Sequence, residues 1–125
     1  MVTRENVSEM IFVIDDNEEL AECVTKATGQ ACSKFTNVIE AIQAIDESGV
    51  PEMIFMEMVT TGPDGFTFLN EMMSYDDTAR VPIVLMSDKN IAKVDLSDYG
   101  VVGVLNKDTM TPKEVQEYVQ KYARN

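Results

Sequence analysis

Short runs rich in apolar residues constrain the fold of this chain more than any other feature. Four of them stand out, at Met10–Ile14, Pro51–Met56, Val81–Met86 and Val101–Leu105, and a weaker run lies at Ala31–Phe35. Strands buried on both faces read as continuous apolar runs, whereas strands with one wet face alternate apolar and polar residues. We therefore expect buried strands of a parallel sheet.

The first two segments between these runs carry the apolar spacing of a helix. In Glu18–Thr28 apolar residues recur three or four positions apart, and Gly29 follows as a C-terminal cap. Asn37 is a favourable N-cap for a second helix, which Gly49 ends. The apolar stripe of this second helix consists of Val38, Ile42 and Ile45.

Three further helices are expected in the second half of the chain. Phe66–Tyr75 is predicted to bury Phe66, Leu69, Met72 and Met73 on one face. Asn90–Gly100 is short and has a poor stripe, so it is the weakest of the helices. Thr111–Glu114 forms a capping box with Pro112 at the first helical position, which opens a final helix through Tyr122.

Strands that alternate with helices predict an α/β fold. We expect a doubly wound, five-stranded parallel sheet in the order 2-1-3-4-5, covered by helices on both faces in a flavodoxin-like three-layer arrangement. No linker or repeat divides the chain, so residues 1–125 are expected to form a single domain. An FMN-binding flavodoxin is disfavoured because the loop after the first strand, Asp15–Leu20, is anionic and would repel a phosphate.

Charge and composition limit the classes of partner. The formal net charge is −12, which disfavours binding to nucleic acids or to anionic membranes. No apolar run approaches the roughly 20 residues of a membrane span, and the polar N-terminus lacks a secretory signal, so we expect a cytoplasmic protein. Cys23 and Cys32 are expected to be free thiols. The absence of His makes a zinc site improbable.

Polar residues gather where the predicted strands end. The first strand ends at Asp15 and Asp16, the third at Glu57, the fourth at Ser87 and the fifth at Lys107. Carboxyl ends of parallel strands meet at one edge of a doubly wound sheet. Three carboxylates there repel one another unless a cation or the lysine neutralises them, so this edge is expected to bind a hard cation such as Mg²⁺ weakly.

These residues, with the "PDG" sequence at Pro63–Gly65, resemble the receiver domain of two-component response regulators, as in chemotaxis regulators, over nearly the whole chain. The resemblance implies that Asp15, Asp16, Glu57 and the backbone carbonyl of Val59 bind Mg²⁺. It implies that Glu57 occupies the position of the phospho-accepting aspartate. Ser87 and Lys107 take the positions that contact the phosphoryl group.

Three positions depart from the family pattern. The acceptor aspartate is Glu57, the proline that usually follows the lysine is Asp108, and the aromatic switch residue of the fifth strand is Val104. We expect a trans Lys107–Asp108 peptide, because a non-proline cis bond costs about 2.5–4 kcal/mol. We also expect Lys107 to lean towards Glu57.

The resulting prediction is an atypical or pseudo-receiver, not an enzyme, that acts through protein–protein contacts with Glu57 in place of the acceptor. Its expected partner is a sensor histidine kinase or another signalling protein, and it is expected to be a monomer or weak dimer. Output is expected on the fourth helix, fifth strand and last helix. One alternative is a Mg²⁺-dependent receiver phosphorylated by a histidine kinase. A small phosphotransfer or hydrolytic enzyme is another.

Overall fold

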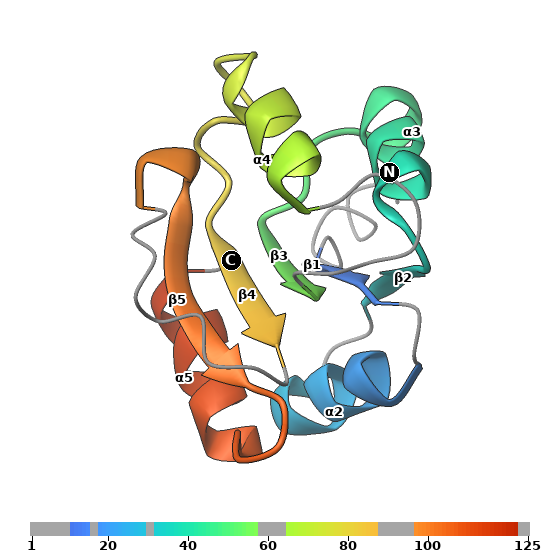
Figure 1. Cartoon of the computed structure of the whole chain (residues 1–125). Coiled ribbons are helices and arrows are strands. Elements are labelled where there is room, and N and C mark those ends of the chain that lie inside the picture. Colours follow the sequence, from blue (N-terminus) through green and yellow to red (C-terminus); the bar gives the residue numbers. More distant parts are fainter. Residues whose placement is uncertain (1–10, 16–17, 30–31, 58–64, 88–96, 123–125) are drawn as a thin grey trace.

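Five parallel strands form one sheet in the order β2-β1-β3-β4-β5, which confirms the predicted fold class (Figure 1). The computed structural model describes residues 11–15, 18–29, 32–57, 65–87 and 97–122. Within these ranges the strands are β1 (Ile11–Ile14), β2 (Ser33–Phe35), β3 (Met53–Glu57), β4 (Ile83–Ser87) and β5 (Val101–Asn106). The helices are α2 (Glu18–Thr28), α3 (Val38–Ser48), α4 (Gly65–Met73), the 3₁₀ helix η1 (Ser97–Tyr99) and α5 (Pro112–Tyr122).

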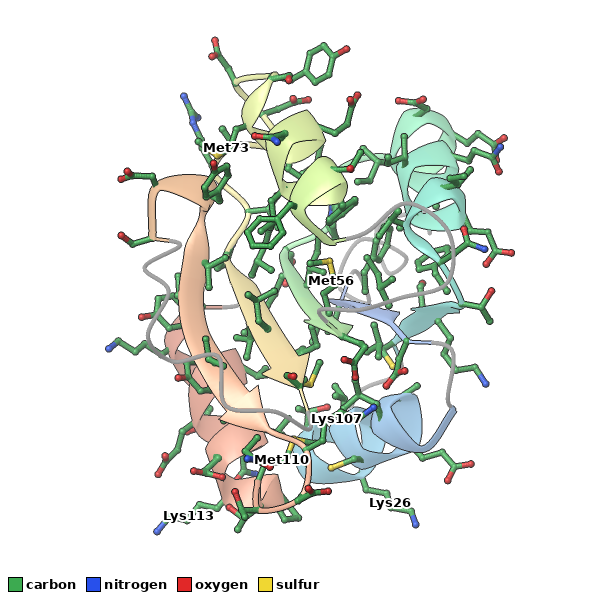
Figure 2. The ribbon with its side chains drawn as sticks, viewed as in Figure 1. Lys26, Met56, Met73, Lys107, Met110 and Lys113 are labelled. Carbon is green, nitrogen blue, oxygen red and sulfur yellow. The ribbon has the colours of Figure 1, made fainter. Side chains whose placement is uncertain are left out.

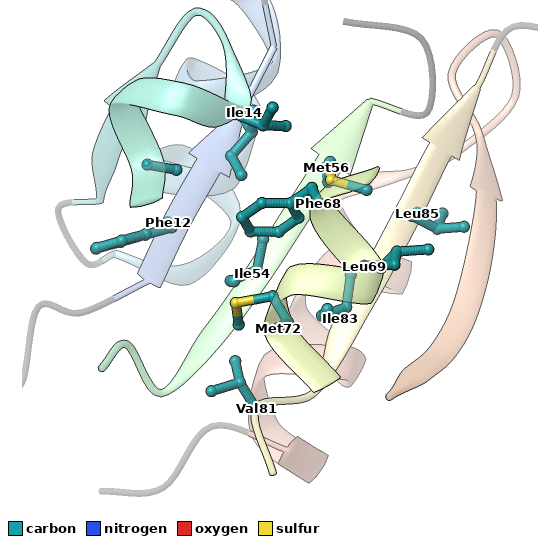
Figure 3. Close-up of a cluster of buried hydrophobic side chains, with 12 residues drawn as sticks. Phe12, Ile14, Ile54, Met56, Phe68, Leu69, Met72, Val81, Ile83 and Leu85 are labelled. Carbon is teal, nitrogen blue, oxygen red and sulfur yellow. The ribbon is translucent and has the colours of Figure 1, made fainter. Parts of the chain in front are cut away.

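Two separate hydrophobic cores lie on the two faces of the sheet. On one face, alternate residues of β1, β3 and β4 pack against α3 and α4, with Phe12, Ile54, Phe68, Leu69 and Met72 among them (Figure 3). On the other face, the intervening strand residues pack against α2 and α5. Because successive side chains point to opposite faces, each central strand must be apolar at every position. This requirement explains the continuous apolar runs in the sequence.

Local capping signals in the sequence are confirmed at several helix ends. The Asn37 side chain accepts a hydrogen bond from the Glu40 N–H at 3.0 Å. At the start of α5 the Thr111 N–H donates to Glu114 Oε1 at 2.9 Å, and the Glu114 N–H donates to Thr111 Oγ1 at 3.2 Å. Gly29 has a φ of 72° and its N–H donates to the Thr25 carbonyl, as expected of a glycine that ends a helix.

The predicted buried face of α4 was wrong in two of its four positions. Phe68, Leu69 and Met72 are buried, together with Gly65, whereas Phe66 and Met73 are exposed. Phe68 and Leu69 lie four and three positions before Met72, so all three share one arc of the helix. Phe66 and Met73 are seven positions apart and share a neighbouring arc that the sheet does not cover.

Element boundaries differ from the prediction in the second half of the chain. β4 begins at Ile83 instead of Val81, because Pro82 has no N–H to contribute to a ladder. β5 continues to Asn106, and Val101–Val104 are only half-buried, since β5 lies at the edge of the sheet. Of the predicted Asn90–Gly100 helix the structure describes residues 97–100, in which Ser97–Tyr99 form the 3₁₀ helix η1 and not an α-helix. The remainder lies outside the described residues.

Three further expectations concern the two cysteines, the Lys107–Asp108 peptide bond and membrane-spanning helices. Cys23 and Cys32 are both free, as predicted, and both are half-buried. The described residues contain no cis peptide bond, so the Lys107–Asp108 peptide is trans. None of the helices within the described ranges is long and apolar enough to cross a membrane.

Candidate functional site

The carboxyl ends of four strands bring the predicted site residues to one edge of the sheet. β1 is followed directly by Asp15, β3 ends at Glu57 and β4 ends at Ser87. Glu57 is paired in register with Met86, so Ser87 lies one residue beyond it, and Ser87 is paired with Asn106. The Lys107 N–H donates to the Ser87 carbonyl at 2.9 Å, which continues the β4–β5 ladder into the site.

Lys107 joins the two carboxylates of this edge. Its Nζ donates to Glu57 Oε1 at 2.8 Å and to Asp15 Oδ2 at 3.0 Å. Figure 2 shows Lys107 extending from the end of β5 towards the carboxyl ends of β1 and β3. The expectation that Lys107 leans towards Glu57 is therefore confirmed, and Asp15 is a second partner of the same ammonium.

Because these ion pairs are largely buried, we expect them to affect stability more than an ion pair on the surface would. Asp15, Glu57 and Ser87 are buried, and the Lys107 side chain is 27 % exposed. Burial alone would lower the pKa of Lys107, but its hydrogen bonds to Glu57 and Asp15 and their negative charges raise that pKa above its ordinary value. Loss of one partner would leave a charge in a poorly solvated place, which is costly.

The turn after β5 fixes the backbone that carries Lys107. Asn106 Oδ1 accepts a hydrogen bond from the Asp108 N–H at 2.8 Å, and the Asn106 carbonyl accepts from the Met110 N–H at 2.8 Å. This pattern is an Asx turn, in which an Asn side chain imitates a backbone turn. Asn106 was not among the site residues predicted from the sequence, although the Asn-x-Asp pattern around Lys107 was a usable signal.

Two of the predicted metal ligands, Asp16 and the Val59 carbonyl, lie outside the described residues. In the part of the chain that is described, no group of three acidic, His or Cys residues could hold a metal ion. Asp15 and Glu57 do supply carboxylate oxygens, the donor type that Mg²⁺ and Mn²⁺ prefer. These two residues therefore fit a hard divalent cation, with the Lys107 ammonium as a neighbouring positive charge.

No protein-family profile matches the sequence, and no curated protein matches it either. Solved structures do match. The receiver domain of NtrX from Brucella abortus aligns with a TM-score of 0.74 and 19% identity, over 89% of this chain and 95% of that one. The phosphorylated cyanobacterial phytochrome response regulator RcpA aligns with a TM-score of 0.74 and 18% identity, over 90% and 91% of the two chains.

This chain has the receiver-domain fold. The Mn²⁺-bound response regulator Rcp1 also aligns, with a TM-score of 0.67 and 18% identity over 89% of this chain and 88% of that one. At such low identity the similarity establishes the receiver-domain fold alone.

Proposed function

We propose that this chain is an atypical receiver module that signals through protein–protein contacts and is held in one state by Glu57 and Lys107. The observation that supports this most directly is the 2.8 Å hydrogen bond between Lys107 Nζ and Glu57 Oε1. The acceptor position thus carries a carboxylate that already binds the lysine expected to contact a phosphoryl group. A partner protein would recognise this arrangement without prior phosphorylation of the chain.

The extra methylene of glutamate is the physical basis of the fixed state. Glutamate places its carboxylate about 1.5 Å, one C–C bond, further from the backbone than aspartate does. In-line transfer to a carboxylate nucleophile depends on near-attack geometry that is worth several kcal/mol. A carboxylate displaced towards Lys107 would be a poor phosphate acceptor and would imitate part of the charge of a phosphorylated aspartate.

A weakly bound Mg²⁺ is part of the proposal. Asp15, Asp16, Glu57 and the backbone carbonyl of Val59 would hold it, with Ser87 and Lys107 beside it. When bound, such an ion neutralises negative charge at the edge of the sheet. Asp15 and Glu57 already share the Lys107 ammonium. Because that ammonium already neutralises part of the negative charge of the two carboxylates, it lowers the affinity of the site for the ion.

The alternative function is a conventional receiver that accepts phosphate on Glu57 from a histidine kinase with Mg²⁺. One similar structure is a phosphorylated response regulator and another is Mn²⁺-bound, and both support this alternative. A phosphotransfer or hydrolytic enzyme is disfavoured, because the two described carboxylates of the strand-end site, Asp15 and Glu57, both bind the Lys107 ammonium and neither is set aside as a general base. In either receiver function the protein would work in the cytoplasm with a sensor histidine kinase or another signalling protein. It would do so as a monomer or weak dimer.

Intact-mass measurement after incubation with a small acyl-phosphate donor and Mg²⁺ tests the proposal. The wild-type chain is expected to remain unmodified under conditions in which Glu57→Asp gains the mass of one phosphoryl group. Glu57→Gln is the control for modification elsewhere in the chain. Phosphorylation of Glu57 in the wild type at the same rate as phosphorylation of the Glu57→Asp variant would refute the proposal that Glu57 holds one state. The conventional receiver function would then stand.

A further inference from the structure

A cavity of about 460 Å³ lies at the amino ends of β3, β4 and β5. Because the strands are parallel, this cavity and the strand-end site of Lys107 lie at opposite ends of the sheet (Figure 1). Ligand pockets in proteins have volumes of about 300–1,000 Å³ and a mostly apolar lining with a few polar groups. The volume of this cavity therefore suits a small organic molecule.

Most of the lining is apolar. Pro51 and Val81, which precede β3 and β4, are buried. Four half-buried side chains extend this apolar surface, and they belong to Val50, Pro82, Val102 and Tyr122. An aliphatic or aromatic group of a ligand would leave water when it covers these side chains, which favours its binding.

Two side chains of opposite charge line the same cavity without pairing with each other. Arg80 and Asp77 are both exposed. Within the ranges that the structure describes, neither side chain forms an ion pair or a hydrogen bond. Arg80 is also the only Lys or Arg in the sequence between Lys34 and Lys89. A guanidinium and a carboxylate are thus available to a ligand beside an apolar surface.

The turn that carries these two charges is held by the residue between them. Thr78 is buried, and its hydroxyl donates to the Met72 carbonyl, with the Tyr75 carbonyl as a second acceptor at 3.3 Å. The Ala79 N–H donates to the Tyr75 carbonyl at 2.9 Å, and the Val81 N–H donates to the Thr78 carbonyl at 3.2 Å. A site whose backbone is already ordered loses less conformational freedom when a ligand binds.

We propose that this cavity binds a free α-amino acid with an apolar side chain. The ligand carboxylate would pair with Arg80, whose planar guanidinium can donate two parallel hydrogen bonds. The ligand ammonium would pair with Asp77, and the ligand side chain would pack on Pro51 and Val81. A carboxylate without an ammonium would fit less well, because Asp77 and Glu52 both line the cavity and would repel it.

Binding at the amino ends of the strands does not depend on the chemistry at their carboxyl ends. Glu57 and Lys107 are absent from the lining of the cavity. The proposed amino-acid site and the proposed fixed state of Glu57 can therefore fail independently.

Titration of the isotope-labelled chain with L-leucine and two analogues tests the proposal by NMR. Leucinamide lacks the carboxylate, and 4-methylpentanoate lacks the ammonium. Leucine is expected to shift the amide signals of Val81, Gly100 and Val102 with saturable binding, and each analogue is expected to bind about tenfold more weakly, equivalent to about 1.4 kcal/mol. Equal binding of all three compounds, or leucine-induced shifts confined to the surroundings of Lys107, would overturn the proposal.

Two charge-removing variants assign the ends of the ligand. Arg80→Gln should weaken leucine binding about tenfold and leave leucinamide binding unchanged, because only leucine has the carboxylate that Arg80 pairs with. Asp77→Asn should weaken leucine binding by a similar factor without weakening the binding of 4-methylpentanoate. In each variant the unaffected analogue also reports that the cavity is still folded.

Matched control variants remove exposed charges that do not line the cavity. Lys113→Gln and Asp46→Asn change the net charge as Arg80→Gln and Asp77→Asn do, and should leave leucine binding unchanged. Equal losses in the control variants would show that leucine responds to net charge alone. Equal weakening of leucine and leucinamide by Arg80→Gln would likewise contradict the proposed role of Arg80.

Discussion

Lys107 and Glu57, fifty residues apart in the sequence, are joined by a 2.8 Å hydrogen bond at the carboxyl edge of the sheet. Asp15, which directly follows β1, accepts from the same Nζ at 3.0 Å. Two buried carboxylates thus share one ammonium. The ammonium limits the mutual repulsion of the two carboxylates, so stability and cation binding at this edge should both depend on Lys107.

Lys107→Met should destabilise the fold although it removes no buried apolar contact. It leaves Asp15 and Glu57 close together and without the ammonium, and the loss of one partner of a buried hydrogen-bonded pair costs about 1–3 kcal/mol, more for charged groups. Urea unfolding followed by circular dichroism measures the change. Lys113→Met, at an exposed position in the first turn of α5, is the control and should be nearly neutral. Equal stability of the two variants would show that the ion pairs contribute nothing.

The stabilisation from Lys107 should disappear only at high pH. Burial lowers the pKa of Lys107, but the hydrogen bonds to Glu57 and Asp15 outweigh it, so the folded-state pKa lies above the ordinary value of 10.5. A raised pKa means that the contribution is complete below 10.5 and falls as the pH rises above that value. The difference in unfolding free energy between wild type and Lys107→Met should stay constant from about pH 7 to 9. It should shrink above pH 10.5. A difference that shrinks already below pH 9 would contradict this assignment.

Divalent cations should bind more tightly when Lys107 is removed. Lys107→Met eliminates a positive charge beside Asp15 and Glu57, and one charge at about 4 Å is worth a few kcal/mol at most near a protein surface. We expect at least a tenfold gain in Mn²⁺ affinity, about 1.4 kcal/mol, measured by paramagnetic broadening of NMR signals. Asp15→Asn should weaken binding, and Lys113→Met should leave it unchanged. Unaltered affinity in Lys107→Met would show that the ammonium and the ion do not compete.

Gly103→Ala should move the side chain of Tyr118. Gly103 lies on β5 directly beneath that ring, and a Cβ at this position would overlap the Tyr118 hydroxyl group. The end of a tyrosine ring can swing aside, so we expect a cost near 1 kcal/mol, the low end of overpacking. Burial raises the pKa of Tyr118, and a displaced ring should titrate closer to its ordinary value. Ultraviolet titration of tyrosinate measures this, with Tyr118→Phe to identify the signal. An unchanged titration curve in Gly103→Ala would contradict the predicted contact.

Asn106→Ala should loosen the turn that carries Lys107. It removes the acceptor of the Asp108 N–H, a hydrogen bond of 2.8 Å, and is expected to cost about 0.5–1.5 kcal/mol. Hydrogen exchange of the Asp108 amide should accelerate. Asn106→Asp keeps an acceptor oxygen at the same place and should retain most of the protection. Equal exchange in all three proteins would show that the side chain does not hold the turn.

Local chemistry allowed much of the fold to be predicted from the sequence. Caps such as Asn37 and Thr111 act on backbone groups within a few residues, so their effect does not depend on the rest of the chain. The apolar strands are nearly as local, because burial on both faces requires an apolar residue at every position. The sheet order followed because right-handed crossovers and short connections leave few alternatives.

Only the tertiary structure decided which residues of α4 face the sheet, how deeply β5 is buried and where the Lys107 ammonium lies. Phe66 and Phe68 are equally apolar, and only the orientation of α4 against the sheet buries one and exposes the other. The edge position of β5 leaves Val104 half-buried despite its apolar run. Asp15, Glu57 and Lys107 lie at one edge of the sheet because each of them ends or directly follows a strand. The sharing of one ammonium by both carboxylates depends on distances between three strands, which no local pattern encodes.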